Sequence, residues 1–275
     1  MMTLGVDLTG APRAVIVDES GAVTARGHGS GRDDVIKSVT GKARVNAVGV
    51  AIPDDADQNI GVVGAPVTRC SPGGAAVAAE AWIGMAQGAK HAVALSIGEH
   101  VYAGLLLDGR VWNGAHNRAG AAAWLALNPV ERQDYRKLGN LAAEVGFKAI
   151  ARRLSWRVQA GDESDVPQRA GDLDAITARH VFDGARSGDG VAISVVRDTA
   201  KYIGMAVANL AATVDPEMIV IGGEIASAKD LLQEAVLQEC ARRLPAATMD
   251  ALRVGFSALG ADAVAIGAAR LAMSP

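Results

Sequence analysis

The sequence has few cysteines and few aromatic residues, and each shortage excludes a class of site. Cys70 and Cys240 are the two cysteines among 275 residues, and they lie far apart with no CxxC or Cys/His cluster. A structural zinc site needs about four closely arranged ligands, so we expect no metal site and two reduced, half-buried thiols. Aromatic residues make up 4% of the chain, too few to stack single-stranded bases between basic residues.

Basic runs and long apolar runs are also missing. The formal net charge is −3, and the pairs Arg152-Arg153 and Arg242-Arg243 stand alone, as solvated or helix-end charges do. Direct nucleic-acid binding needs a basic stripe and is not expected. Every long apolar run is broken by Gly or charge before it could span a membrane, and residues 1–10 lack the regions of a signal peptide. We therefore expect a soluble, cytoplasmic protein without membrane contact.

Alanine, glycine and short apolar runs are abundant instead, which suits Ala-rich helices packed closely on sheets. Short apolar runs bounded by Gly or Pro predict strands, and apolar residues at helical spacing predict helices. The polar stretch 156–171 predicts a loop. The order of elements predicts an α/β chain of two lobes, residues 1–115 with the C-terminal helix returning onto them, and residues 116–275. The expected strands are residues 4–8, 14–18, 22–25, 44–52, 92–97, 103–107, 218–221 and 253–256, and the expected helices are 33–40, 73–87, 139–155, 174–184, 191–214, 229–243 and 261–273.

Three segments of the C-terminal half carry a motif order that is repeated in one known family. They are residues 188–210 (GDGVAISVVRDTAKYIGMAVANL), 214–224 (VDPEMIVIGGE) and 260–269 (GADAVAIGAA). They resemble the long helix, the DP-x-x-I-V-x-G-G strand and the closing helix of the ROK family of bacterial sugar kinases and sugar-responsive regulators. Residues 5–10 (GVDLTG) and 113–120 (NGAHNRAG) match that family by layout. The resemblance implies the two-lobed actin-like ATPase or sugar-kinase fold, which is ribonuclease H-like.

The resemblance implies a first phosphate-binding turn that is weakened here. Asp7, Thr9 and Gly10 stand where the family has G-x-D-x-G-G-T, and Asp7 ends a strand where it could organise hydrated Mg²⁺. Pro12 removes one N–H donor. An ordinary strand-ending Asp explains the same residues, and both interpretations stay open.

The second phosphate-binding turn is expected at residues 98–104 (GEHVYAG), where the family has alternating glycines. Gly98 is retained as a phosphate-binding candidate. The side chains at 99–103 hinder φ > 0 and keep phosphate from the backbone. Glu99 also places a negative charge where an anion would bind, so family-like phosphate binding is not expected at this turn.

The adenosine side of the implied cleft is the best preserved. Gly222 and Gly223 follow a buried strand and would allow close approach of a base and ribose, and Glu224 could meet a ribose hydroxyl. A plain strand-to-helix turn also favours these glycines.

The position of the family's catalytic base is occupied by proline. Residues 71–80 (SPGGAAVAAE) align with N-D-A-N-A-A-A-x-x-E, which puts Pro72 at the Asp, so no catalytic residue is expected. Ser71 as N-cap with Pro72 at the first helical position accounts for the same residues. Residues 67–70 alone separate this point from residues 60–66 (IGVVGAP), where the family has a few tens of residues that include a sugar-contacting loop.

The sugar-binding motif is also replaced. The family's G-E-x-G-H corresponds to residues 120–124 (GAAAW), and its zinc-binding cysteines are absent from residues 127–139. Asn113 and Trp124 remain as sugar-binding candidates, although a core or interface Trp is the simpler interpretation.

We therefore expect a sugar-kinase-like protein that has lost kinase activity and has a binding, regulatory or scaffolding role. We expect it to form a homodimer, to need no cofactor and to act through a protein partner or a small-molecule ligand. It begins at the first strand without the DNA-binding helices of the family's repressors, so operator binding is not expected. The alternatives are an active ATP- and Mg-dependent sugar kinase, or an enzyme with rebuilt chemistry that uses Asp54, Asp55, Asp57, Glu99 and His100.

Overall fold

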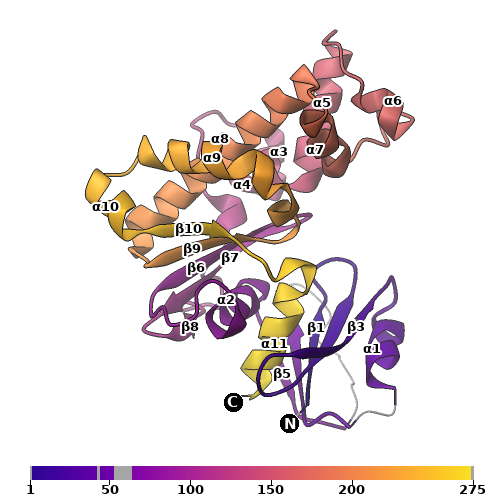
Figure 1. Ribbon diagram of the computed structural model, residues 1–275, viewed down its shortest axis with the longest axis vertical. Helices are drawn as coiled ribbons and strands as arrows, with labels where there is room; N and C mark the ends of the chain where they lie inside the picture. Colours follow the sequence, from indigo (N-terminus) through magenta and orange to yellow (C-terminus); the bar gives the residue numbers. More distant parts are fainter. Residues whose placement is uncertain (1, 42–43, 53–63, 274–275) are drawn as a thin grey trace.

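The structure, a computed structural model, describes residues 2–41, 44–52 and 64–273 and has two lobes, each built on a five-stranded sheet (Figure 1). The first sheet contains β1 (Thr3–Asp7), β2 (Arg13–Val17), β3 (Val23–His28), β4 (Ala47–Ala51) and β5 (Val67–Cys70). The second sheet contains β6 (Ala92–Ile97), β7 (Val101–Leu107), β8 (Arg110–Trp112), β9 (Met218–Gly222) and β10 (Arg253–Phe256).

The two sheets have the same topology, a repeat that the residues themselves do not reveal. In each, three strands joined by hairpins are antiparallel, and two later strands extend the sheet in parallel on the other side of the first strand. The orders are β3-β2-β1-β4-β5 and β8-β7-β6-β9-β10. The β1–β2 turn and the β6–β7 turn therefore hold equivalent places in the two lobes.

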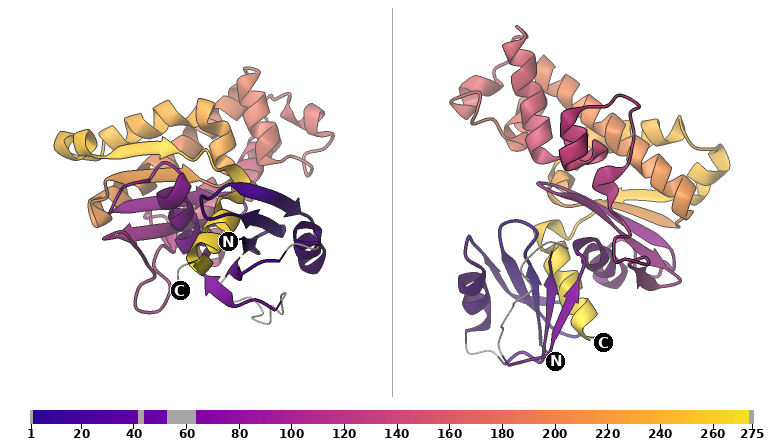
Figure 2. Two further views of the ribbon diagram at one scale, coloured as in Figure 1. Left: turned by 60° about the horizontal axis from the view of Figure 1, so that its bottom comes forward. Right: turned by 180° about the vertical axis from the view of Figure 1, so that it is seen from behind.

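Helices cover both faces of both sheets (Figure 2). The α1 helix packs on β2 and β3, α11 on β1 and β4, and α2 on β6 and β7, while α4, α5, α7, α8 and α9 form the far layer of the second lobe. The helices are α1 (Arg32–Thr40), α2 (Pro72–Ile83), α3 (Gln133–Leu138), α4 (Asn140–Val145), α5 (Phe147–Gln159), α6 (Val166–Ala170), α7 (Ala178–Arg186), α8 (Gly190–Val214), α9 (Lys229–Ala241), α10 (Ala246–Ala251) and α11 (Ala263–Met273), with short 3₁₀ turns η1 (Ala122–Trp124), η2 (Glu224–Ala228) and η3 (Gly260–Asp262).

The strand β6 shows how alternation places different residues on the two faces of a sheet that is buried on both sides. Ala92 and Ala94 lie in the core beside α2, while Val93 and Leu95 lie in the larger core beside α8. The small residues allow α2 to approach closely, whereas the larger ones fill the space under the helical layer.

Close backbone contacts between α2, α11 and the first sheet account for much of the glycine and alanine content. A Cβ added at Gly267 of α11 would lie 1.7 Å from the carbonyl oxygen of Ala75 in α2, and one at Gly5 of β1 would lie 1.8 Å from the carbonyl oxygen of Ala265. Since no side chain fits there, larger residues would force these elements apart. The helix pair α2–α11 is the main packing contact between the lobes.

The expected elements are present, but several bounds differ: the helix expected at residues 73–87 ends at Ile83, and β5, α3 and α10 were not expected. The expected helix 139–155 is broken at Gly146 into α4 and α5, the expected helix 174–184 begins at Ala178, and the predicted loop 156–171 instead holds the end of α5 and the short α6. The strands up to β5 belong to the first sheet and those from β6 onward to the second, while the expected lobe boundary at residues 115 and 116 stays a prediction. Among the described residues, no helix combines the length and apolar character that a membrane span requires.

Candidate functional site

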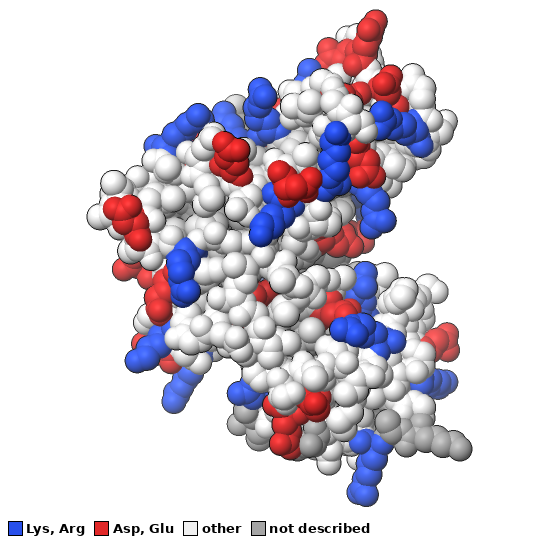
Figure 3. All heavy atoms as spheres, viewed as in Figure 1, with Lys and Arg blue, Asp and Glu red and all other residues white. Residues whose placement is uncertain are grey.

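The two equivalent turns face each other across a cleft between the lobes, seen as the indentation on the right of Figure 3. Two adjacent cavities lie in it and share Arg13, Gly223, Glu224 and the η3 region. The cavity between the turns measures about 140 Å³, and its neighbour below α7 measures about 690 Å³. Of the expected nucleotide-binding residues, Asp7, Thr9, Gly10, Gly98, Gly223 and Glu224 line the smaller cavity.

Asp7 lies at the end of β1 and is 7% exposed. Its Oδ1 accepts hydrogen bonds from the backbone nitrogen of Thr9 at 2.9 Å and from the Thr9 hydroxyl at 2.7 Å. Burial raises the pKa of this carboxyl, and the Thr9 bonds, Arg13 and His100 offset part of that rise. Asp7 is thus held locally within the chain, in agreement with the interpretation as an ordinary strand-ending Asp.

Asp7 is also a possible carboxylate for Mg²⁺, which usually binds through one or two carboxylates, waters and substrate phosphates. No group of three potential metal ligands occurs within the part of the chain that the structure describes. A magnesium ion here would therefore depend on phosphates bound between the two turns. Whether phosphates fit between the two turns therefore decides whether the site can hold the metal.

The β6–β7 turn is shorter than expected. Gly98, Glu99 and His100 alone lie between the strands, whereas Val101 and Tyr102, which we expected to fill the turn, belong to β7. The Gly98 nitrogen donates to the His100 carbonyl at 3.0 Å, so this amide is already bonded within the turn. The Tyr102 phenol is placed among Asp7, Thr9 and Ser96, where burial raises its pKa. The turn offers no glycine cradle for phosphate.

Glu99 was expected to repel an anion at this turn, and the structure weakens that argument. Its Oε1 lies 2.6 Å from the Lys148 Nζ of α5, and this bond lowers the pKa of Glu99. Its other oxygen lies 3.9 Å from the position a Cβ would take at Gly10. Glu99 therefore occupies space between the turns, but Lys148 balances its charge.

The adenosine side is built by the loop after β9. Gly223 has φ 80°, and a Cβ there would lie 2.6 Å from the Ile97 carbonyl oxygen, so the packing of β9 against β6 alone requires this glycine. Gly222 ends β9 and lines neither cavity. The larger cavity is also lined by residues that the sequence did not indicate, because no motif places them beside the cleft: Arg13, Phe147, Arg179, His180, Phe182 and Ser257.

Pro72 is the first residue of α2, and Ser71 is its N-cap, whose Oγ accepts from the Gly74 nitrogen at 3.1 Å. The structural interpretation of these residues is confirmed. Strand β5 ends at Cys70, directly before the cap, where burial raises the pKa of the thiol to about 12. Neither Ser71 nor Pro72 has a side chain that titrates near neutral pH, and the raised pKa keeps the Cys70 thiol protonated there.

Glu80, in the same helix, is a structural carboxylate. It is 2% exposed, and its two oxygens accept hydrogen bonds from the Ser257 hydroxyl at 2.5 Å and the Met85 nitrogen at 3.0 Å. It fastens α2 to the loop that follows β10.

The two sugar-binding candidates are not brought together. Asn113 lines a cavity of about 800 Å³ between β5, β8, α2 and α11. Trp124, in η1, is 58% exposed and lines neither that cavity nor the two in the cleft. His100 lines the smaller cleft cavity, while Asp54, Asp55 and Asp57 lie outside the described residues.

Comparison with known proteins agrees with this fold. The model of the ROK family matches residues 73–274. The chain is 30% identical over 204 residues to a glucokinase from Halalkalibacterium halodurans, which covers 74% of this chain and 62% of the glucokinase. The chain therefore spans less than two thirds of that relative's length.

Solved structures share the architecture over the whole chain. A ROK family glucokinase from Streptomyces griseus in complex with glucose and AMPPNP has a TM-score of 0.85 at 23% identity, covering 100% of both chains. A ROK family transcriptional regulator, a homolog of the E. coli MLC protein, has a TM-score of 0.82 at 22% identity, covering 98% of this chain and 77% of that one. The chain therefore belongs to the ROK family and has its sugar-kinase-like, actin-like ATPase fold.

Proposed function

We propose that this chain is a non-catalytic ROK protein with a binding, regulatory or scaffolding role in place of sugar phosphorylation. The observation that carries the proposal is that Pro72 is the first residue of α2; the resemblance of residues 71–80 to the family motif aligns this proline with the general base. Loss of a general base typically removes about 10²–10⁴-fold of rate. A regulator among the proteins of the same fold is consistent with such a role.

The phosphate side of the cleft supports the proposal. Small-molecule pockets usually measure roughly 300–1,000 Å³; the cavity of about 690 Å³ falls in this range, whereas the 140 Å³ between the turns does not. Glu99 and Tyr102 occupy the space, and the Gly98 amide is already bonded. A nucleoside would fit better than its triphosphate.

An active ATP- and Mg-dependent sugar kinase is the second candidate. It is supported by the glucokinase relative, by Asp7 at the end of β1 and by the larger cavity. In that case Asp7 would help hold the magnesium ion, which would balance the phosphate charge. Both turns would have to open to admit the phosphates.

Nucleotide binding and turnover distinguish the two candidates. Thermal-shift measurements with adenosine, AMP and ATP·Mg²⁺ would compare binding of a nucleoside, expected in the larger cavity, with binding of phosphates, which would need the smaller one. We expect ATP to stabilise the protein no more than adenosine does. A coupled ADP assay with glucose and N-acetylmannosamine should give no hexose-dependent signal, with the Halalkalibacterium glucokinase as positive control. Saturable ADP production that Asp7→Ala abolishes would refute the proposal.

The chain is also proposed to form a homodimer through exposed apolar side chains near η1 and α3. Trp124 and Val130 are each 58% exposed, and Leu138 is 49% exposed. Apolar side chains gathered on a surface commonly mark an interface. Analytical ultracentrifugation should find a dimer that Leu138→Asp dissociates, while Trp112→Asp, an exposed Trp on β8, leaves it intact. A monomeric parent chain would contradict the proposal.

A further inference from the structure

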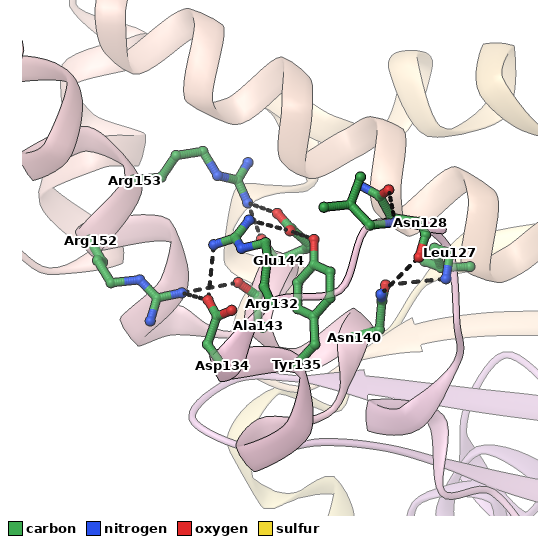
Figure 4. A network of polar contacts seen from close by, with 11 residues as sticks. Leu127, Asn128, Arg132, Asp134, Tyr135, Asn140, Ala143, Glu144, Arg152 and Arg153 are labelled. Atoms are coloured by element: carbon green, nitrogen blue, oxygen red, sulfur yellow. Dashed lines mark hydrogen bonds and ion pairs between the residues drawn. The ribbon is translucent and has the colours of Figure 1, made fainter.

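A cavity of about 460 Å³ lies in the second lobe among α3, α4, α5 and α8. It shares no lining residue with the cavities in the cleft. Three arginines converge on it: Arg132, before α3, and Arg152 and Arg153, in α5 (Figure 4). Lys201 of α8 also lines it. Its size is suited to a small molecule.

Two carboxylates hold the three guanidinium groups in place. Glu144 accepts from Arg132 Nη1 at 3.1 Å and from Arg153 Nη2 at 3.2 Å, and Tyr135 donates to the same carboxylate. Asp134 Oδ2 accepts from Arg132 Nη2 at 2.9 Å and from Arg152 Nη2 at 2.8 Å. The arginines are therefore fixed before any ligand arrives, which reduces the entropy lost on binding.

The arginine pair was expected from the sequence to be solvated, and the structure corrects this. Arg153 is 16% exposed, and burial lowers its pKa. Arg152 Nε and Arg153 Nη1 are buried and have no hydrogen-bond partner within the described part of the chain. Buried donors normally have partners, so the cluster contains more N–H groups than the protein's own acceptors use.

Two aromatic residues, Trp156 and Tyr202, also line the cavity. The Arg152 guanidinium lies 4.7 Å from the ring centroid of Trp156, and that of Arg153 lies 5.9 Å from the ring of Tyr202. Trp156 is 50% exposed although it lines the cavity. The Arg132 guanidinium also lies 6.0 Å from the Trp156 centroid. An apolar group could therefore pack against the exposed part of Trp156 that the two arginines leave uncovered, while its charged end meets the arginines.

We propose that this cavity binds a small organic monocarboxylate, with its carboxylate on Arg152, Arg153 and Lys201 and its apolar part against Trp156. Arginine is suited to this role because its planar fork matches the geometry of a carboxylate. Arg152 keeps 31% of its side chain exposed and Lys201 is exposed, so both are open to a ligand.

The charge of the site favours a monoanion over a phosphate dianion. Four cationic groups line the cavity (Arg132, Arg152, Arg153 and Lys201), together with the carboxylates Glu144 and Asp198. Asp134 does not line it but pairs with both Arg132 and Arg152, so the cluster as a whole has one excess positive charge. A single carboxylate balances that charge. A dianion would leave an excess negative charge beside Glu144 and Asp198.

The test uses probes of matched shape. Calorimetric titration in a chloride buffer would compare benzoate with benzamide, its uncharged counterpart, and with phenyl phosphate; acetate and pyruvate extend the carboxylate series. We expect benzoate to bind at least about tenfold more tightly than benzamide, since a hydrogen bond to a charged group is worth about that factor. Benzoate should also bind more tightly than phenyl phosphate, because the cluster balances one negative charge and not two. Benzoate should also quench tryptophan fluorescence, and Trp156→Leu should remove the quench.

Variants of the lining residues test whether benzoate binds in this cavity. Lys201→Gln and Arg152→Gln should each weaken benzoate binding by about tenfold. Lys201 is exposed and takes no part in the hydrogen bonds described above that join the three arginines to Asp134 and Glu144, so its removal should leave folding intact. Arg157→Gln is the control, because Arg157 lies on the same helix, pairs with Asp162 and does not line the cavity. Equal binding of benzamide, tighter binding of phenyl phosphate, no binding of any carboxylate, or equal effects of Lys201→Gln and Arg157→Gln would each overturn the proposal.

Discussion

Thr9 donates two hydrogen bonds to one oxygen of Asp7, from its backbone nitrogen at 2.9 Å and from its hydroxyl at 2.7 Å. Asp18 and Ser20, after β2, repeat the same arrangement at 2.9 and 2.6 Å. The pKa of Asp7 is nevertheless raised, chiefly by burial, whereas that of exposed Asp18 is lowered, chiefly by its bond from the Ser20 hydroxyl. The same pair of bonds thus accompanies opposite pKa shifts, because Asp7 is buried and because Asp18 accepts a further bond from the Ala22 nitrogen at 3.0 Å.

Asp7→Asn should alter the pH dependence of stability. Because the folded pKa of Asp7 lies above the ordinary value of 3.8, the stability that Asp7 contributes is present below pH 3.8 and is lost as the pH rises through the folded pKa. The free energy of unfolding of the variant, measured relative to that of the parent, should therefore rise between pH 4 and 7. Urea unfolding at several pH values measures this difference.

Asp18→Asn is the matched control with the opposite sign. Its lowered pKa contributes stability that is present above 3.8 and is lost as the pH falls through the folded pKa. The loss in free energy of unfolding that Asp18→Asn causes should therefore become smaller as the pH falls. If both variants changed with pH in the same direction, burial of Asp7 would not be the dominant cause.

Glu80→Ala should strongly destabilise the fold. The substitution leaves the Ser257 hydroxyl and the Met85 nitrogen without the carboxyl group that now accepts from both. Two lost hydrogen bonds with part-buried donors cost about 3 kcal/mol together. Chemical unfolding measures the loss. Glu163→Ala, at an exposed site, is the control and should change stability by less than about 0.5 kcal/mol. Equal effects of the two variants would show that Glu80 does not fasten α2 to the loop after β10.

Features with a local cause could be predicted from the sequence. The Asp108-Gly109 turn has φ values of 51° and 73°, as the hairpin pattern requires. The cap at Ser71 and the start of α2 at Pro72 depend on residues within one helical turn. The β9 strand and the α8 helix were predicted from their apolar runs, because this pattern lies within each segment.

Features with a non-local cause could not be predicted. The pair of Lys148 with Glu99 and the network around Arg153 join segments that only the fold brings together. The end of α5 was mistaken for a loop because the chain there is polar, although stacking of Arg152 on Trp156 supports a helix. The size of the cavity between the two turns depends on where Tyr102 lies, which the register of β7 sets.

Gly223→Ala should separate the strain of a left-handed backbone from that of a close contact. Gly223 and Gly188 have φ values of 80° and 89°, so an alanine at either position has the cost of a sparsely populated backbone region, about 1–3 kcal/mol. A Cβ at Gly188 would have no neighbour within 4 Å, whereas one at Gly223 would lie 2.6 Å from the Ile97 carbonyl oxygen. The free energy of unfolding should therefore fall further for Gly223→Ala than for Gly188→Ala, by at least about 1 kcal/mol, because overpacking adds its own cost. Equal losses would mean that the loop after β9 yields without strain, and the packing requirement assigned to Gly223 would then be wrong.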